Sequence, residues 1–188
     1  MFDEVAKLLA VPGAVGVMPT DTIYGLVARA SDRQAVARLY GLKNRINKLG
    51  TLIGADVDQI AEVGLKKRYL QAVRQYWPGP VSVIVPCGPD LEYLHLGKFG
   101  LATRIPDYPE LLELLRQTGP LITSSANLPD QPPSTNIQEA KAYFGNTVDF
   151  YIDAGDLSKN LPSTIIRIVD DAIEVIRQGA VKIQENER

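Results

Sequence analysis

The chain has 188 residues, 45% of them hydrophobic, which is enough to bury one sizeable core, and its formal net charge is −2. This charge argues against a uniformly basic nucleic-acid binder and leaves only a local patch for RNA contact. The single cysteine, Cys87, excludes an intramolecular disulfide and a cysteine metal cluster and indicates a reducing cytoplasm. The first residues form an amphipathic pattern with acidic side chains near the N-terminus, unlike a signal peptide. No apolar run is long enough to cross a bilayer.

Hydrophobic spacing predicts alternating helices and strands in the first half of the chain. Val5, Leu8 and Leu9 fall at helical spacing, and a Ser-Asp capping signal precedes a second helical pattern. Short apolar runs bounded by glycine and proline indicate buried strands. The expected elements are a helix ended by Pro12-Gly13, a strand at 14–18, a helix at about 32–42, a strand at 51–55, a helix around 65–76 and a strand at 81–85.

The second half is expected to continue this pattern and then change. A strand at 101–105, a helix at 108–117, a strand running into a loop at 120–125 and a helix through Phe144 are predicted, the last with Asn136 and Glu139 as a capping box. Three β-rich runs follow with hardly a helix between them. The fold class is therefore α/β, with a mixed sheet and antiparallel pairing near the C-terminus. With no repeat and no convincing linker, residues 1–188 are expected to form a single domain.

Several polar clusters lie at the ends of predicted strands and helices. In α/β folds these ends gather ligand-binding side chains from distant parts of the sequence. The clusters are PTDTIYGL at 19–26, KNR at 43–45, TRIP at 103–106, TSSAN at 123–127, and PST at 162–164 together with IRQG at 176–179.

The cations in these clusters suit an anionic ligand. Lys43 and Arg45, two positions apart after a helix, could bind a phosphate chain from an extended segment, or form a solvated basic turn beside the helix dipole. Arg104 follows an apolar strand, so it needs either a ligand carboxylate or an internal salt bridge. Arg177 is either a third cation of the site or a surface strand residue.

The hydroxyl and amide groups admit two interpretations as well. The TSSAN loop could hydrogen-bond a ribose, a base edge or phosphate oxygens, or satisfy its own turn, and Ser163 and Thr164 share this ambiguity. No P-loop or Rossmann glycine motif is present, and His95 is expected to be structural. No ordered set of histidine, cysteine or paired carboxylates predicts a protein metal site.

Taken in order, six segments resemble the YrdC-like family in its short bacterial form. They are PTDTIYGL, the KxR of Lys43-Asn44-Arg45, WPGPVSVIVP, TRIPDYP, TSSANLPDQPP, and PSTIIRI followed by IRQG. The resemblance covers almost the whole chain. It implies a YrdC-like fold with a twisted, open, mixed β-sheet, flanking helices and a large, concave, locally positive cavity.

The resemblance also implies an activity. L-threonine, bicarbonate and ATP would be joined to L-threonylcarbamoyl-AMP and pyrophosphate, the first step toward threonylcarbamoyladenosine in tRNA. Mg²⁺ would accompany ATP. The implied macromolecular contacts are with tRNA or double-stranded RNA and, transiently, with the threonylcarbamoyl-transferase complex.

Carried over residue by residue, the resemblance implies two groups of site residues. Lys43 and Arg45, exposed to the cavity and catalytic, would hold the ATP phosphates, and Ser125, Asn127 and Arg177 would complete the nucleotide site. Thr20, Thr22, Arg104, Thr123 and Ser163 would hold threonine, with Arg104 binding its carboxylate, Tyr24 shaping the pocket wall and Gly25 letting the backbone turn away. Asp21 would be an outer-sphere metal ligand, an orienter of the amine or a turn cap.

The chain departs from the family pattern in places. The family often has proline after the KxR arginine and, in longer members, a histidine contact and a second C-terminal domain; here INKLGTLIGAD follows, with no counterpart for the proline or histidine and no room for the domain. The alternatives are a non-catalytic RNA- or ribosome-binding module and a carbamoyl-transfer relative that uses carbamoyl phosphate. Retention of both KxR and Ser-x-Asn favours catalysis, because an RNA surface needs no hydroxyl and amide at fixed loop positions.

Overall fold

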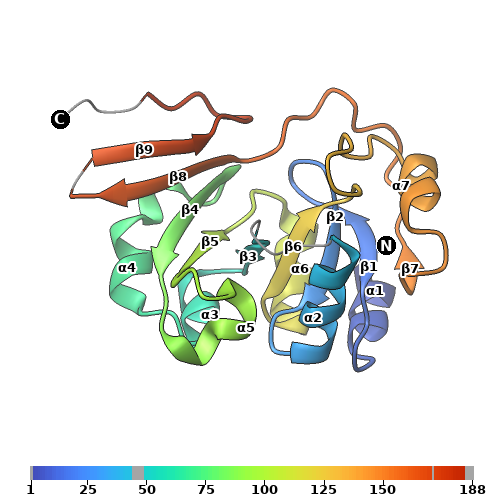
Figure 1. The fold of residues 1–188 in the computed structure, drawn as a ribbon, viewed down its shortest axis with the longest axis horizontal. Coiled ribbons are helices and arrows are strands. Elements are labelled where there is room, and N and C mark those ends of the chain that lie inside the picture. Colours follow the sequence, from blue (N-terminus) through green and yellow to red (C-terminus); the bar gives the residue numbers. More distant parts are fainter. Residues whose placement is uncertain (1, 44–48, 171, 185–188) are drawn as a thin grey trace.

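The computed structural model describes residues 2–43, 49–170 and 172–184, and its strands form one nine-stranded sheet (Figure 1). The strand order is β7-β1-β2-β6-β3-β5-β4-β8-β9. The strands are β1 (Gly16–Pro19), β2 (Tyr24–Arg29), β3 (Thr51–Ile53), β4 (Val81–Pro86), β5 (Gly100–Arg104), β6 (Leu121–Ser125), β7 (Phe150–Tyr151), β8 (Thr164–Val169) and β9 (Ala172–Arg177).

The sheet is mixed, as the sequence predicts. Strand β2 pairs antiparallel with β1 and β6, and β6 pairs antiparallel with β3. Strands β3 and β5, β4 and β8, and β1 and β7 pair in parallel. Antiparallel pairs also join β4 to β5 and β8 to β9, so the predicted antiparallel pairing near the C-terminus is confirmed.

Two helices begin at the capping side chains that the sequence predicts. Asp32 accepts a hydrogen bond from the backbone N–H of Ala35, and Asn136 accepts one from Glu139, which confirms both predicted starts. The Glu139 carboxylate accepts from the N–H of Thr135 instead of Asn136, so the capping box is only half formed. The helices are α1 (Phe2–Leu9), α2 (Arg33–Leu42), α3 (Val57–Glu62), α4 (Lys67–Ala72), η1 (Arg74–Tyr76), η2 (Pro89–Leu91), α5 (Glu92–His95), α6 (Pro109–Thr118) and α7 (Ile137–Phe144).

Helix α3, strand β2 and the short helices η2 and α5 differ from the sequence-based expectation, which included none of them. Helix α3 was not predicted, although Asp56 caps it by accepting from the N–H of Gln59. Strand β2 begins within PTDTIYGL, so only residues 20–23 form the turn. The role expected for Gly25 is wrong, because it lies inside β2, where a Cβ atom would stand 2.6 Å from the hydroxyl of Thr123. Gly25 therefore allows close approach of a neighbouring side chain and does not make a turn.

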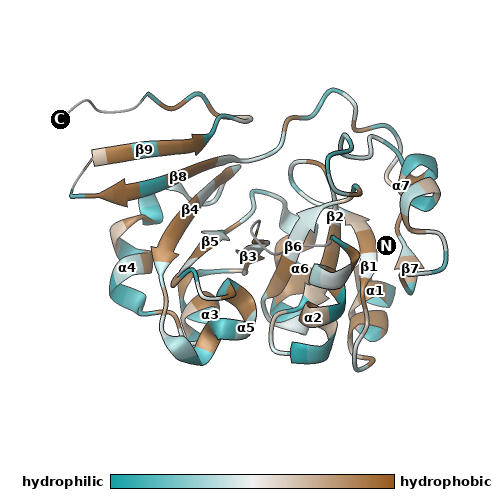
Figure 2. Ribbon diagram, viewed as in Figure 1, coloured by the Kyte–Doolittle hydropathy of each residue, from teal (hydrophilic) through white to brown (hydrophobic). Residues whose placement is uncertain are grey.

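Alternation along the strands gives the sheet two apolar faces, and hydrophobic residues follow the strands in Figure 2. Leu26, Leu52 and Leu101 belong to one core cluster, to which α2, α4, α5 and α7 contribute. Val27 and Ile53 belong to the opposite cluster, which α1 and α6 cover. No helix in the described ranges is long and apolar enough to cross a membrane.

The face under α1 and α6 continues beyond these helices as a polar surface. In strand register, Thr123 lies two residues after Leu121, Thr51 lies two residues before Ile53, and Arg104 pairs with Ile53. Because side chains two positions apart share a face, strands β6, β3 and β5 present polar side chains there, and β2 presents Gly25. This surface is the floor of the candidate site.

Candidate functional site

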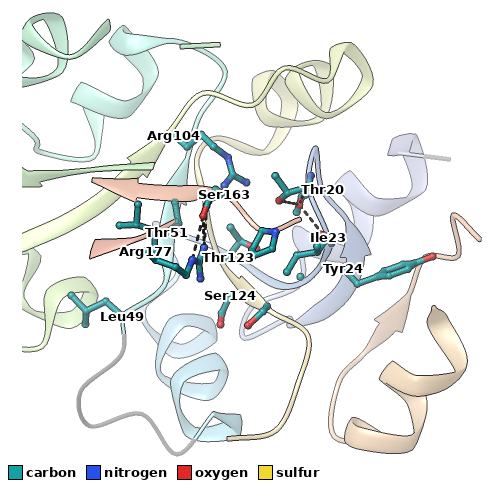
Figure 3. Close-up of a pocket in the computed structure, with 15 residues that line it drawn as sticks. Thr20, Ile23, Tyr24, Leu49, Thr51, Arg104, Thr123, Ser124, Ser163 and Arg177 are labelled. Carbon is teal, nitrogen blue, oxygen red and sulfur yellow. Dashed lines mark hydrogen bonds between the residues drawn. The ribbon is translucent and has the colours of Figure 1, made fainter. Parts of the chain in front are cut away.

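A polar pocket opens over this floor (Figure 3). Strand ends and loops from Thr20 to Arg177 contribute to it, so four of the five predicted clusters meet at the pocket, whereas Lys43 and Asn127 are not among its lining residues. The predicted site residues along its lining are Thr20, Thr22, Tyr24, Arg104, Thr123, Ser125, Ser163 and Arg177. Residues of the lining that the sequence did not single out for the site are Ile23, Leu49, Thr51, Ser124, Pro162 and Ile165.

The β1–β2 turn brings two hydroxyl groups to the pocket. The Thr20 hydroxyl donates to the carbonyl of Ile23 at 2.8 Å and lies 3.0 Å from the Thr22 hydroxyl. Because the hydroxyl proton of Thr20 is donated to Ile23, the hydrogen bond between the two hydroxyls is donated by Thr22. Both residues are more than nine-tenths buried, so their positions are fixed by the turn itself.

Arg104 and Asp21 form a buried ion pair beside this turn. The Arg104 Nη2 atom lies 2.8 Å from Asp21 Oδ1, and the two side chains are only 4% and 3% exposed. Arg104 Nη1 also donates to the Ser82 hydroxyl at 3.3 Å. Burial raises the pKa of Asp21 against the opposing charge of Arg104, and burial lowers the pKa of Arg104. Of the two partners left open for Arg104, the internal salt bridge is the one observed.

Arg177 and Ser163 lie on the adjoining wall. Arg177 donates to the Ser163 carbonyl from Nη2 at 2.7 Å and from Nε at 3.2 Å, and the Ser82 hydroxyl donates to that of Ser163 at 2.9 Å. Burial, followed by the nearby charge of Arg104, lowers the pKa of Arg177. Two guanidinium groups therefore face one pocket, which favours an anionic ligand between them.

Lys43 does not have the exposed position expected of it, since the residue is only 4% exposed. Its ammonium donates to the carbonyls of Ser125 and Asn127 at 2.8 and 2.5 Å and to Asn127 Oδ1 at 2.7 Å. The Ser125 hydroxyl donates to the same amide oxygen at 2.6 Å. Lys43 thus fixes the loop that the sequence assigns to the nucleotide, while Arg45 lies outside the described residues.

Tyr24 lines the pocket from its strand position, but its side chain points away from the threonine and arginine side chains in Figure 3. Its hydroxyl donates to the carbonyl of Gly155 at 2.9 Å and accepts from the N–H of Ala154 at 2.8 Å. Tyr24 therefore belongs to the pocket lining, while its hydroxyl anchors the connection from β7 to β8, and its part in holding threonine stays a prediction.

His95 has a structural role. It is fully buried, its Nε2 lies 3.1 Å from the carbonyl of Gly88, and its Nδ1 accepts from the N–H groups of Gly97 and Phe99. Across residues 2–43, 49–170 and 172–184, no three histidine, cysteine, aspartate or glutamate side chains group as metal ligands.

Comparison with known proteins relates this chain and its fold to one family. The Sua5/YciO/YrdC family model, described as "Telomere recombination", matches residues 10–179. The threonylcarbamoyl-AMP synthase of Serratia proteamaculans is 35% identical over 168 residues, 86% of this chain and 87% of that protein.

Two solved structures share the fold. The chain matches P. abyssi Sua5, crystallised in complex with L-threonine, with a TM-score of 0.82 and 26% identity over 95% of this chain. It spans only 54% of the Sua5 chain. E. coli YciO matches with a TM-score of 0.81 and 22% identity over 96% of this chain and 90% of YciO, and shows the fold alone. Together with the family model, these likenesses show that the chain belongs to the Sua5/YciO/YrdC family.

Proposed function

We propose that this protein is a threonylcarbamoyl-AMP synthase that joins L-threonine, bicarbonate and ATP and releases pyrophosphate. The observation that carries the proposal is the polar pocket, in which Arg104 and Arg177 stand among the hydroxyls of Thr20, Thr22 and Ser163. Relatives with this activity in their name, and a relative crystallised with L-threonine, support the choice of ligand.

The threonine side of the site is proposed around Arg104 and the neighbouring hydroxyl groups of the lining. Arg104 would bind the carboxylate through its Nε–H, which has no acceptor in the described part of the protein, and through its charge. The hydroxyls of Thr20, Thr22, Thr123 and Ser163 would take the remaining polar groups. Tyr24 would serve this side indirectly, through the backbone at Gly155 that its hydroxyl holds.

The nucleotide side is proposed around the Ser125–Asn127 loop and Arg177. Lys43 belongs to this side, because the three oxygens that surround its ammonium come from Ser125 and Asn127. Lys43 and Arg45 would compensate the phosphate charge, and Lys43 would also hold the loop in place.

The chemistry requires no nucleophilic residue. The amine of threonine bonds to the carbon of bicarbonate with loss of water, or to that of carbon dioxide with loss of a proton, to give a carbamate. A carbamate oxygen then attacks the α-phosphate of ATP, and the bond from the α-phosphorus to the oxygen bridging the β-phosphate breaks with release of pyrophosphate. Orientation and charge neutralisation can supply most of the acceleration. Mg²⁺ would be held by phosphate oxygens and water, which suits a pocket whose nearby carboxylate, Asp21, already pairs with Arg104.

A cytoplasmic location belongs to the same proposal, because the product serves tRNA modification. So do contacts with tRNA and, transiently, with the threonylcarbamoyl-transferase complex. We further propose that residues 1–188 act as a single YrdC-like domain, since β1 to β9 all join one sheet.

The test is pyrophosphate release from ATP with magnesium, measured with and without L-threonine and bicarbonate. L-serine and a bicarbonate-depleted mixture are the controls. Release that requires L-threonine and bicarbonate together would support the synthase. No release, combined with salt-sensitive RNA binding, would favour the non-catalytic binding module.

A further inference from the structure

The Arg104–Asp21 ion pair is incomplete in a way that distinguishes it from an ordinary structural pair. An arginine and a carboxylate commonly form two parallel hydrogen bonds. Here only Nη2 and Oδ1 come together, at 2.8 Å, and the contact of Nη1 with Ser82 is long at 3.3 Å. Arg104 Nε and Asp21 Oδ2 are buried and have no hydrogen-bond partner.

Such a pair is unfavourable if stability is its only purpose. Charged groups removed from water need most of their hydrogen-bonding positions filled, and a partly satisfied polar network is poorer than an apolar one. Yet Arg104 lines the pocket, and Asp21 stands between the lining residues Thr20 and Thr22. The unmet donor therefore belongs to a side chain that lines the pocket.

The pair also connects distant parts of the pocket. Asp21 lies in the β1–β2 turn, while Arg104 ends β5, and strands β6 and β3 lie between β2 and β5 in the sheet. The ion pair therefore joins the two sides of the floor that Thr123 and Thr51 help to form. Among the contacts described for the guanidinium, the one that fixes its direction is the ion pair with Asp21.

Asp21 also sets the charge of the pocket. The described lining includes two cations, Arg104 and Arg177, and no acidic residue. With Asp21 beside Arg104, the three groups sum to one positive charge, which matches a single carboxylate. Without the charge of Asp21 the same pocket would attract inorganic dianions more strongly.

We propose that Asp21 is a positioning residue for the amino-acid substrate: its one-sided ion pair holds Arg104 across the pocket floor and leaves the Nε–H for the substrate carboxylate. The inference rests on the proposed function, because the carboxylate is that of L-threonine. Asp21 acts through Arg104, so its effect must disappear when Arg104 is replaced.

The test is calorimetric titration of L-threonine, and separately of inorganic phosphate, into wild type, Asp21→Asn, Arg104→Gln and the double variant. We expect Asp21→Asn to weaken L-threonine binding roughly tenfold, the size typical of coupled residues in contact, and to strengthen phosphate binding. In the Arg104→Gln background, Asp21→Asn should have no further effect on the affinity for L-threonine. Glu174→Gln is the matched control, because it removes one acid from an exposed arginine pair outside the pocket.

Unchanged L-threonine affinity in Asp21→Asn would overturn the inference while the proposed function stands. Weaker binding of both L-threonine and phosphate to Asp21→Asn would also overturn the inference and indicate a purely structural role. So would a double variant in which the two losses of L-threonine affinity add. Failure of wild type itself to bind L-threonine would reject both proposals. If Asp21→Asn does not fold, Asp21→Glu retains the charge but displaces the guanidinium, and it should still weaken L-threonine binding severalfold.

Discussion

Two buried cations lie in this part of the molecule, and their surroundings differ. The Lys43 ammonium, with three N–H donors, reaches three oxygens within 2.8 Å. The Arg104 guanidinium makes one short hydrogen bond, to Asp21, and one long one, to Ser82, and its Nε–H has no acceptor. The two residues both belong to motifs of the family, but the structure gives them different roles. Lys43 holds a loop in place, whereas Arg104 keeps an N–H donor that is available to a ligand.

Replacing Lys43 should have the largest effect on stability. Lys43→Met removes three charge-assisted hydrogen bonds, although Asn127 Oδ1 keeps the Ser125 hydroxyl as a donor and the Ser125 carbonyl keeps the Asn127 N–H. We expect the free energy of unfolding to fall by about 3 kcal/mol or more, measured by urea denaturation. Lys7→Met, on the exposed side of α1, is the control and should change it little. Equal unfolding midpoints for Lys43→Met and wild type would contradict the structural role of Lys43.

Replacing Gly179 tests how rigidly the side of the pocket formed by Arg177 and Ser163 is held in place. A Cβ atom at Gly179 would stand 2.1 Å from the carbonyl oxygen of Pro162, which is backbone and cannot swing aside. Gly179→Ala should destabilise the fold by about 1–3 kcal/mol and weaken L-threonine binding through Ser163. Gly41→Ala, where nothing lies within 4 Å in a helix, should be neutral or slightly stabilising in the same thermal melt. If Gly179→Ala is as stable as wild type, the backbone at Pro162 and Ser163 can shift to accommodate the added methyl group.

Arg104→Lys should sharpen the contrast between the two cations. The substitution keeps the charge but removes the planar set of donors, so we expect L-threonine to bind roughly tenfold more weakly while stability changes by about 1 kcal/mol or less. Calorimetry and a thermal melt measure both. Arg167→Lys, in the exposed pair on the β8–β9 hairpin, is the matched control. Full affinity in Arg104→Lys would mean that a point charge suffices there.

The smallest effect is expected at the exposed pair itself. Arg167 and Glu174 lie 2.7 Å apart, but their side chains are 48% and 45% exposed. Because solvent screens such a pair, Glu174→Gln should change the free energy of unfolding by no more than about 0.5 kcal/mol. A larger loss in urea denaturation would show that exposure is a poor guide to the role of an ion pair in this protein.

Local signals in the sequence predicted much of the fold. The caps at Asp32 and Asn136 correctly marked two helix starts, and the apolar runs marked the strands. Helix α3 escaped notice because six residues give too short a periodic pattern. Strand β2 was missed because its first residues read as the end of a polar turn.

The site could be predicted only in part. Hydroxyl-bearing positions such as Thr22 and Ser163 stand out at the ends of elements, but Ser82 and Thr51 lie within apolar runs and carry no local signal. Their place depends on strand register, which brings Ser82 to Ser163 and Arg104. The burial of Lys43, and the choice of Asp21 as the partner of Arg104, depend on contacts across more than 80 residues.

The spread of the lining from Thr20 to Arg177 has a consequence for how the protein is made. Neighbouring strands β2, β6, β3 and β5 come from four separated parts of the chain, so the pocket forms only after long-range pairings close. A growing chain cannot bind substrate until β9 has left the ribosome. Once folded, the protein gains stability from any ligand that binds only the native state, and the melting temperature should rise with L-threonine concentration. Substrate supply would then help set how much enzyme survives in the cell.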